Sequence, residues 1–325
     1  MIFAQQFDNR QLDEWTGSGC KYRKRTFPKQ GRDQLPIEIC KANTMDHLCS
    51  EYRAKLLFKS KALSLLDVRC SGDCRHPTAS RACPVTHLVF PYHGTFVRHI
   101  GMAESVAEAN QLVFINGDEE YQVSHTAEGG DACLLLNVDA ELLMELSPAG
   151  EIVPGEKVRF RQPSVGIGPR SQALLAKLRY RFLSGAVDPL ETESLLLELV
   201  AGSLRKASIS SSSNTYGQQK LVNRAKLLLA SEPGRRWALS EIADQVGGVS
   251  PAYLTHVFAR VEGIPLYQYQ LRLRLARALH LVGERSDLTE LAFDMGFSSH
   301  SHFSAAFRQQ YGRSPREFRG RTQVR

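Results

Sequence analysis

The last third of the chain contains one sequence pattern twice, and this repeat restricts the folds open to the chain. Residues 241–258 and residues 290–307 align without a gap at an offset of 49 residues. In each copy a short apolar helix pattern ends at a glycine, Gly247 or Gly296, and Ser or Pro residues then cap a second helix pattern. Two helices around a tight glycine turn are typical of a helix-turn-helix unit. The apolar residues that the second helices would bury are Leu254, Phe258, Phe303 and Phe307.

One long helix, residues 266–282, is predicted between the two copies. Its inward stripe consists of Leu271, Leu275, Ala278 and Leu279. About 16 residues at roughly 1.5 Å each reach about 24 Å. With its flanking turns, such a helix can hold two recognition helices about one DNA turn, ~34 Å, apart. The alternative is an ordinary helical bundle with a chance internal similarity.

The positive charge of the chain is concentrated in the same segment. The chain has 41 Lys and Arg against 34 Asp and Glu, a net charge of +7. Residues 216–325 contain 16 basic and 9 acidic residues, so they carry the whole excess, and 14 of the 16 are arginines. Because arginine binds phosphate with two parallel hydrogen bonds, this asymmetry indicates a polyanion partner for the C-terminal domain.

Residues 221–319 resemble the DNA-binding domain of the AraC/XylS-type transcription regulators. The most specific part is residues 294–319, DMGFSSHSHFSAAFRQQYGRSPREFR, which is similar to the family's signature at its second helix-turn-helix. The resemblance implies sequence-specific binding to double-stranded DNA, with two recognition helices in adjacent major grooves, and favours an activator. One departure is the turn Gly247-Gly248-Val249, which is one residue longer than usual and affects the aim of the first recognition helix.

The residues expected to contact DNA lie opposite the buried face of each second helix. The resemblance implies that the base contacts are made by Ala252, Thr255, His256, His300, Ser301, Ser304 and Ala305. Most of these side chains are weak sequence readers, so we expect DNA shape to contribute to specificity. Phosphate contacts, which position the protein without reading sequence, are predicted at Arg274, Arg308, Arg313 and Arg316. For each of these arginines the alternative is a solvated surface side chain.

The preceding part of the chain is predicted to be a sensor domain, residues 46–206, after a loosely ordered leader, residues 1–45. Short apolar runs separated by Gly, Pro and Asn indicate a β-sandwich or barrel. These runs are residues 62–68, 87–90, 94–98, 111–115 and 132–136. Two amphipathic helix patterns, residues 171–182 and 195–204, then predict a helical hairpin that caps the barrel or mediates dimerisation. A Ser-rich linker, residues 207–218, separates the sensor from the double helix-turn-helix domain, residues 219–325.

Residues 87–138 are similar to the cupin-like effector domain attached to many AraC-type regulators. The segments that carry this resemblance are LVFPYHGTFV, residues 88–97, and ANQLVFINGDEEYQVSH, residues 109–125. The expected fold is therefore multidomain α+β, with a cupin-like β-barrel and a helical hairpin followed by an all-α double helix-turn-helix domain.

An enzymatic role has little support in the sequence. The predicted barrel lacks the arrangement of two histidines and one glutamate found in metal-dependent cupin enzymes, and the chain has no nucleophile elbow, phosphate-binding glycine loop or dinucleotide fingerprint. We expect no catalytic residues and no required cofactor. The alternative, a cupin-type enzyme tethered to DNA, would be favoured by turnover of a small ligand or by a metal at His87 and His93.

A second candidate site consists of Cys70, Cys74, His76 and Cys83. A Cys-x3-Cys pair with a nearby His and a third Cys is compatible with a zinc site of the Cys3His type. It is equally compatible with a thiol pair that oxidises, or with inert loop cysteines. DNA binding controlled by zinc or thiol oxidation at Cys70, Cys74 and Cys83 is thus an alternative to control by a small molecule.

The composition sets the expected environment and partners. No run approaches the ~18 consecutive apolar residues of a membrane span, and the N-terminus lacks the pattern of a secretion signal. The seven cysteines are therefore expected to be reduced thiols of a cytoplasmic protein. The expected partners are double-stranded DNA, a small-molecule effector, a second copy of the chain in a homodimer and RNA polymerase, with no membrane.

Overall fold

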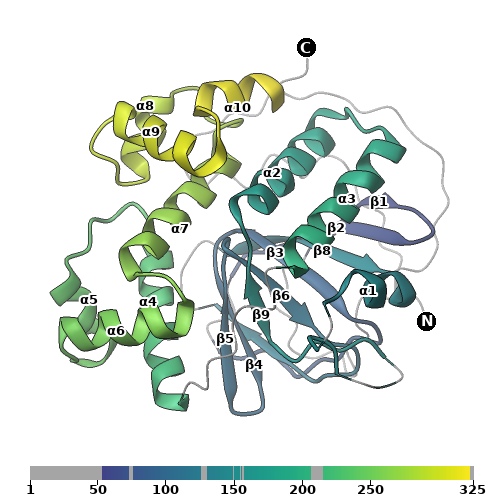
Figure 1. Ribbon diagram of the computed structural model, residues 1–325, viewed down its shortest axis with the longest axis horizontal. Helices are drawn as coiled ribbons and strands as arrows, with labels where there is room; N and C mark the ends of the chain where they lie inside the picture. The colour runs from purple at the N-terminus through teal and green to yellow at the C-terminus, as the bar shows by residue number, and fades with distance from the viewer. Residues whose placement is uncertain are drawn as a thin grey trace. The chain divides into compact units, whose positions relative to one another are not determined.

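The computed structural model describes most of the chain from residue 53 onward (Figure 1). The described residues are 53–72, 76–125, 130–148, 150–153, 155, 157–205 and 215–322. All of them belong to one structural unit, Ile39–Arg325. The predicted leader, residues 1–45, and most of the predicted linker lie outside the described residues.

The first part of the described chain forms two antiparallel β-sheets. The larger sheet has the strand order β1-β2-β8-β3-β6-β9, and the smaller has the order β5-β4-β7. The strands are β1 (Arg53–Lys59), β2 (Leu63–Cys70), β3 (His87–His93), β4 (Phe96–Ile100), β5 (Ala103–Ala107), β6 (Gln111–Ile115), β7 (Gln122–Ser124), β8 (Asp131–Val138) and β9 (Ser164–Gly166). The five predicted apolar runs fall on β2, β3, β4, β6 and β8.

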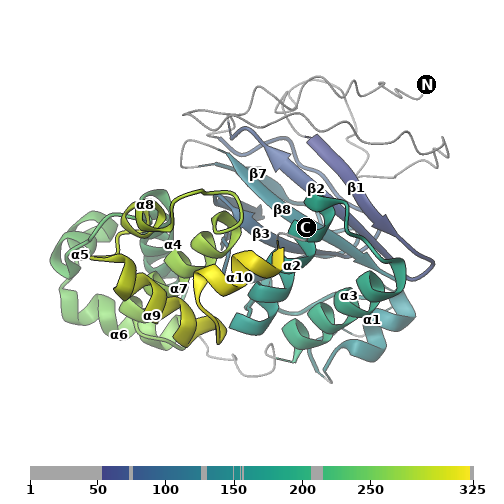
Figure 2. The same cartoon turned by 90° about the horizontal axis from the view of Figure 1, so that it is seen from above.

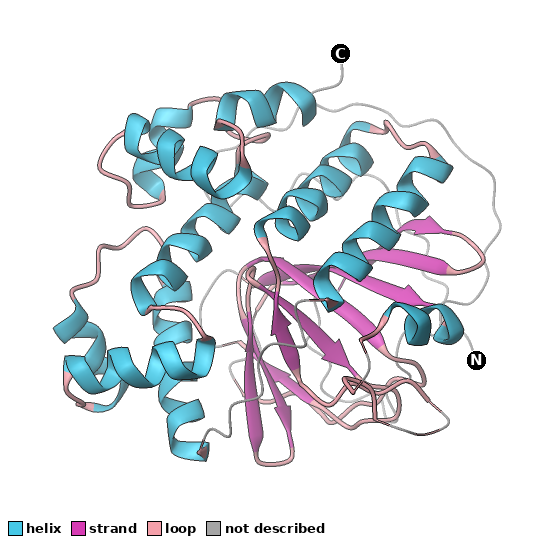
Figure 3. Cartoon of the chain, viewed as in Figure 1, coloured by secondary structure: helices cyan, strands magenta, loops and turns pink. Residues whose placement is uncertain are grey.

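The described strands form two open sheets, so the predicted closed barrel is not confirmed. Strands β1 and β9 lie at the two edges of the larger sheet. Arg53, Lys55 and Lys59 place charges along β1, and charged side chains on an edge strand disfavour further pairing. The architecture is a β-sheet region followed by a helical domain (Figure 3).

The larger sheet is covered on both faces. One face, with Leu65, Phe90 and Leu134, packs against helices α2 (Pro169–Ser184) and α3 (Pro189–Leu204). The other face forms a second core with residues of the smaller sheet. Burial on both faces explains why these strands appear in the sequence as continuous apolar runs. Helices α2 and α3 form the predicted hairpin, and with α1 (Ala140–Leu146) they lie along one side of the sheet (Figure 2).

The C-terminal part contains two helix-turn-helix units. The helices are α4 (Tyr216–Ser231), α5 (Leu239–Gly247), α6 (Pro251–Glu262), α7 (Leu266–Leu281), α8 (Leu288–Asp294), α9 (His300–Tyr311) and α10 (Pro315–Thr322). Helices α5 and α6 form the first unit, and α8 and α9 form the second. None of the described helices is long and apolar enough to cross a membrane.

Helix α7 belongs to the hydrophobic cores of both units. Leu266, Tyr269 and Leu273 pack in the first core, against α4, α5 and α6. Leu275 and Leu279 pack in the second core, against α8, α9 and α10. In Figure 1, α7 runs from the α5–α6 pair to the α8–α9 pair. The predicted connecting helix is thus confirmed, and it ends one residue before the predicted end.

The turn glycines differ between the two units. In the second unit Gly296 has φ +75°, as predicted for the left-handed residue of the turn. In the first unit both glycines of the turn have positive φ, +156° at Gly247 and +63° at Gly248, and Gly248 is the left-handed cap of α5. The left-handed residue predicted at Gly247 therefore lies one position later, in a turn that is one residue longer. Leu254, Phe258, Phe303 and Phe307 are all fully buried, as predicted.

Replacement of Gly296 tests how tightly the second turn is packed. A Cβ atom at Gly296 would overlap the carbonyl oxygen of Gly234, whereas a Cβ at Gly312, which has nearly the same φ of +73°, meets nothing within 4 Å. We expect Gly312→Ala to cost about 1–2 kcal/mol from backbone strain alone. Gly296→Ala should cost a further ~1–3 kcal/mol from the overlap. The free energy of unfolding of the full chain in urea measures both, and equal losses would contradict the close approach.

Candidate nucleic-acid interface

The first recognition helix, α6, has a defined start and one buried face. The Ser250 hydroxyl accepts a hydrogen bond from the backbone N–H of Tyr253, and a proline occupies the first helical position. Opposite the buried face, Ala252 and His256 are exposed. Thr255 is half-buried, and its hydroxyl donates to the carbonyl of Pro251 at 2.9 Å. Of the predicted base contacts on α6, two are therefore open to solvent and the third is engaged with its own helix.

The second recognition helix, α9, is built in the same way. The Ser299 hydroxyl accepts a hydrogen bond from the backbone N–H of His302 at 3.1 Å. His300, Ser301 and Ala305 are exposed, and the half-buried Ser304 has its hydroxyl 3.5 Å from Nε2 of His300. The predicted base contacts on α9 therefore share one polar face of small side chains.

An exposed aromatic side chain on α6 was not predicted. Tyr253 is 47% exposed and lies beside Ala252 and His256 on the helix surface. Its position directly before the buried Leu254 in the sequence could have shown that it points away from the core.

Three of the four predicted phosphate contacts are exposed: Arg308, Arg313 and Arg316. The guanidinium of Arg308 lies 3.9 Å from the Glu317 carboxylate, and both side chains are more than half exposed. Because exposed ion pairs are weak, this contact leaves Arg308 available to a phosphate.

Arg274 is placed differently from the other three arginines. It is half-buried on α7 and donates hydrogen bonds to the carbonyl oxygens of Pro233, at 2.7 Å, and Arg235, at 2.6 Å. Burial lowers the pKa of its guanidinium. Arg236 in the same loop donates to the carbonyl of Gly296 at 3.3 Å. The Arg274 bonds attach the loop before α5 to α7, and the Arg236 bond attaches the same loop to the turn of the second unit. Arg274 therefore has a structural role that the sequence did not predict.

The predicted sensor region, from β1 to α3, contacts the second helix-turn-helix unit through α2. The Tyr180 hydroxyl donates to the carbonyl of His280 at 2.7 Å and accepts from the N–H of Gly283 at 2.9 Å. Arg179 forms an ion pair with Glu284 at 2.8 Å. Helix α2 therefore binds the end of α7 and the segment that leads to α8.

The sensor region also contacts the first unit through β5 and the turn that follows it. Asn223 of α4 donates to the carbonyl of Glu104 at 2.9 Å. Glu108 is fully buried near Lys226, which pairs with Glu262 at 3.1 Å. Burial raises the pKa of the Glu108 carboxyl, and the Lys226 ammonium opposes that shift. Burial also raises the pKa of the nearby Tyr269 hydroxyl, and the Glu108 carboxyl adds to that shift.

The predicted cysteine cluster is not assembled from the residues that the structure describes. Cys70 is buried at the end of β2, His76 is exposed, and Cys74 lies outside the described residues. Cys83 is fully buried and disulfide-bonded, so the prediction that all seven cysteines are reduced was wrong for this residue. A disulfide sulfur does not provide the thiolate that a zinc site needs.

The two histidines considered for an enzymatic metal site have unsuitable surroundings. Nδ1 of His87 contacts the side-chain oxygen of Asn137, and burial lowers the His87 pKa. The pKa of His93 is lowered to about 4, first by burial and then by the nearby guanidinium groups of Arg277, Arg179 and Arg69. Three positive charges around His93 disfavour a metal cation there.

The comparisons with known proteins agree with this geometry. A family model described as a helix-turn-helix domain matches residues 243–321. The transcriptional activator RhaS of Escherichia coli O1:K1 / APEC is 30% identical over 251 residues, which cover 71% of this chain and 84% of RhaS. The Msm operon regulatory protein of Streptococcus mutans serotype c is 27% identical over 126 residues, 38% of this chain and 45% of that protein, so the match spans less than half its length.

One similar solved structure is a transcriptional regulator with an AraC-type DNA-binding domain from Chromobacterium violaceum. It is 31% identical, with a TM-score of 0.31, and the match covers 34% of this chain and 97% of that one. The repeated units, their capped recognition helices and the long match to RhaS lead to one conclusion. The chain belongs to the AraC-type family of helix-turn-helix transcription regulators.

Proposed function

We propose that this protein is a sequence-specific transcription regulator, and an activator, that inserts α6 and α9 into adjacent major grooves of double-stranded DNA. One observation carries the proposal. Two capped helices, each with an exposed polar face, are joined by one helix, α7, which packs in the hydrophobic cores of both. The major groove admits an α-helix, and each base pair presents a distinct pattern there.

The two recognition faces suggest how the sequence is read. His300, Ser301 and Ser304 supply hydrogen-bonding groups, and Ala252 and Ala305 can pack on thymine methyl groups. Arg308 on α9, Arg313 in the turn after it and Arg316 on α10 are assigned to phosphates. Because small side chains dominate both faces, sequence-dependent DNA shape contributes to specificity.

We further propose that a small-molecule effector acts through the contacts between the sensor region and the two helix-turn-helix units. Tyr180 and Arg179 hold the second unit, while Glu104 holds the first through Asn223. An effector shifts the equilibrium only when it binds one arrangement of these parts better than another. The sensor contacts supply interactions whose strength an effector can change.

Dimerisation, contact with RNA polymerase and a cytoplasmic location stay predictions. We expect a second copy of the chain to bind at the turn between α2 and α3, where three apolar residues are exposed: Leu183, Val187 and Leu190. A dimer would double the number of phosphate contacts and half-sites. The relatives are named as regulators, which agrees with a protein that is not an enzyme.

The affinity for DNA should fall steeply with salt concentration. Each phosphate contact contributes about −0.9 to the slope of log affinity against log salt. With three exposed arginines at the second unit, we expect a slope of about −3 or steeper, measured by fluorescence anisotropy on a selected duplex. Arg308→Ala should make the slope about 1 less steep. Arg205→Ala, which removes an exposed arginine after α3, is the matched control, and a slope indifferent to salt would contradict the interface.

Changes on α9 should separate base reading from phosphate binding. We expect His300→Ala or Ser304→Ala to alter the preferred bases in a selection from random duplexes, because these side chains face the groove. Arg308→Ala should instead weaken binding to all sequences alike. Identical sequence profiles for His300→Ala and the unaltered protein would remove His300 from the set of base contacts.

Loss of the Tyr180 hydroxyl should weaken DNA binding although the residue lies in the sensor region. The hydroxyl bonds the end of α7 and the start of the segment to α8, and unmade buried hydrogen bonds cost about 1–3 kcal/mol. Because the second unit is then held less rigidly, we expect Tyr180→Phe to lower DNA affinity about three- to tenfold. Tyr216→Phe, at an exposed tyrosine of α4, is the matched control. If both variants bind DNA as tightly as the unaltered protein, this contact does not couple the sensor to DNA binding.

A further inference from the structure

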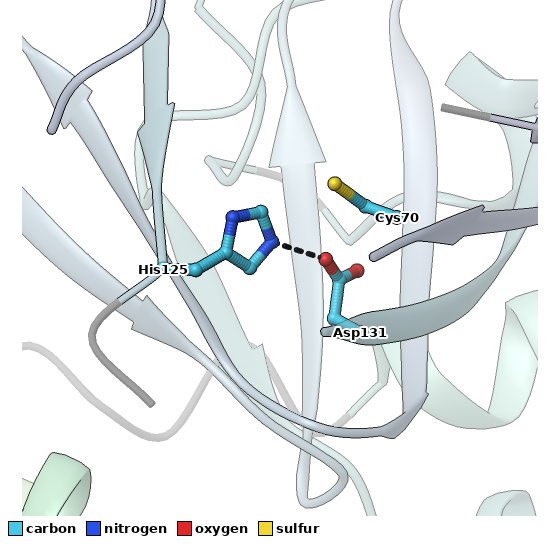
Figure 4. A group of neighbouring side chains, drawn as sticks. All are labelled: Cys70, His125 and Asp131. Atoms are coloured by element: carbon cyan, nitrogen blue, oxygen red, sulfur yellow. Dashed lines mark hydrogen bonds and ion pairs between the residues drawn. The ribbon is translucent and has the colours of Figure 1, made fainter. Parts of the chain in front are cut away.

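Three side chains with metal-ligating groups meet at one end of the β-sheet region. Cys70 is the last residue of β2, and Asp131, the first residue of β8, is its direct partner in the strand register. His125 follows directly after β7 of the smaller sheet. One ligand atom from each residue lies within 4.8 Å of the other two, and all three side chains are buried (Figure 4). Nε2 of His125 lies 2.5 Å from Oδ1 of Asp131.

We propose that Cys70, His125 and Asp131 bind a divalent transition-metal ion of the zinc class. A thiolate, an imidazole and a carboxylate are the three ligand types of protein zinc sites. Zinc bonds of about 2.3 Å to sulfur and about 2.0–2.1 Å to nitrogen and oxygen place the ligand atoms roughly 3–4 Å from one another. The spacing observed here, from 2.5 Å to at most 4.8 Å, brackets that range, so small side-chain rotations suffice.

The charges of the group suit a buried dication. The side chains of His125 and Asp131 are 2% and 8% exposed, and isolated charges are costly at such positions. The Cys70 thiolate and the Asp131 carboxylate together neutralise the two charges of the ion, with His125 neutral. On binding, the Cys70 thiol proton leaves and the neutral His125 carries its one ring proton on the nitrogen that does not bind the metal, so metal binding consumes no oxidant or reductant.

The backbone around the group is packed closely enough to hold the ligands in place. Gly72, Gly94 and Gly130 all have positive φ, of 84°, 66° and 66°. A Cβ atom on Gly130 would overlap the carbonyl oxygen of Cys70, and one on Gly94 would overlap the carbonyl oxygen of Gly130. Rigid support of this kind reduces the ordering that metal binding requires.

This site shares only Cys70 with the cluster predicted from the sequence. His125 and Asp131 replace Cys74, His76 and Cys83. Antiparallel pairing of β2 with β8 brings Asp131 to Cys70 from about sixty positions away, and His125 comes from the end of β7 in the smaller sheet. Cys133, a reduced thiol on the same face of β8 as Asp131, lies outside the ligand group and provides a matched control.

Cobalt substitution of the full-length protein tests the proposal without DNA. The protein is stripped with a chelator, titrated with Co²⁺ under anaerobic conditions and then back-titrated with Zn²⁺. We expect one Co²⁺ per chain, with a sulfur-to-cobalt charge-transfer band and the visible absorption of a low-coordinate ion, both removed by one equivalent of Zn²⁺. Cys70→Ser and His125→Gln should each lower the affinity at least about 100-fold. Cys74→Ser and Cys133→Ser should keep the band.

Two results would overturn the proposal. One is the absence of stoichiometric metal binding by the unaltered protein. The other is a charge-transfer band that survives in Cys70→Ser and disappears in Cys74→Ser, which would return the metal to the cluster predicted from the sequence. Thermal unfolding of the unaltered protein gives a test that does not depend on whether Cys70→Ser folds. Zn²⁺ should raise the unfolding temperature of the unaltered protein, because it binds the folded state. A zinc-independent unfolding temperature would count against the site.

Discussion

The geometry of the DNA-binding half depends on the participation of α7 in two hydrophobic cores. Leu273 packs in the first core and Leu275 in the second, so the division falls within a single helical turn. A straight helix transmits orientation because its backbone is hydrogen-bonded throughout. The loop before α5 adds a second connection, since Arg274 attaches it to α7 and Arg236 attaches it to the turn at Gly296. The two recognition helices are therefore connected through one shared helix and one loop, as the proposed binding to two adjacent grooves requires.

The contacts between the predicted sensor region and the DNA-binding half combine apolar packing with buried polar groups. Ala176 and Tyr180 of α2 share a hydrophobic core with Leu275 and Phe307. Buried polar groups are stable only when they are paired, so the polar contacts add specificity to this packing. Tyr180 satisfies backbone groups at the end of α7, and Lys226 lies between the carboxylates of Glu108 and Glu262. Breaking either contact leaves buried charges or dipoles without partners.

The sequence predicted the elements whose signals are local. Apolar periodicity located α7 and α9, the two capping serines gave the starts of α6 and α9, and continuous apolar runs located the central strands. Strand β1 was missed because it lies at an edge of the sheet, and charged residues on both sides leave only three consecutive apolar residues, Leu56–Phe58. The position of Gly248 in the first turn could not be predicted from the glycine pair alone, since either residue tolerates a left-handed backbone.

In the candidate sites too, the sequence predicted what depends on residues close along the chain and missed what depends on residues that only the fold brings together. Exposure of Arg308, Arg313 and Arg316 follows from the helix pattern, whereas the engagement of Arg274 depends on carbonyl groups about forty positions away. The interpretation of Cys70 with Cys74 and Cys83 was based on nearness along the chain. The partners that the structure brings to Cys70, His125 and Asp131, come from a different sheet and from a neighbouring strand. Spacing identifies a metal site only when all of its ligands lie on one local segment.

The smaller sheet connects the proposed metal site with one of the contacts through which the proposed effector would act. Ser124, next to His125, has its hydroxyl 2.8 Å from Nε2 of His99 on β4. Nδ1 of the same ring lies 3.7 Å from the carboxylate of Glu104 on β5, and the Glu104 carbonyl accepts the hydrogen bond from Asn223 of α4. A series of polar contacts thus leads from the proposed metal ligands to the first helix-turn-helix unit. Any displacement of His125 on metal binding must be accommodated by β7, whose only strand partner in the described chain is β4. Metal binding and effector control would therefore act on the same contact with the DNA-binding half, so metal occupancy should be fixed when effectors are compared.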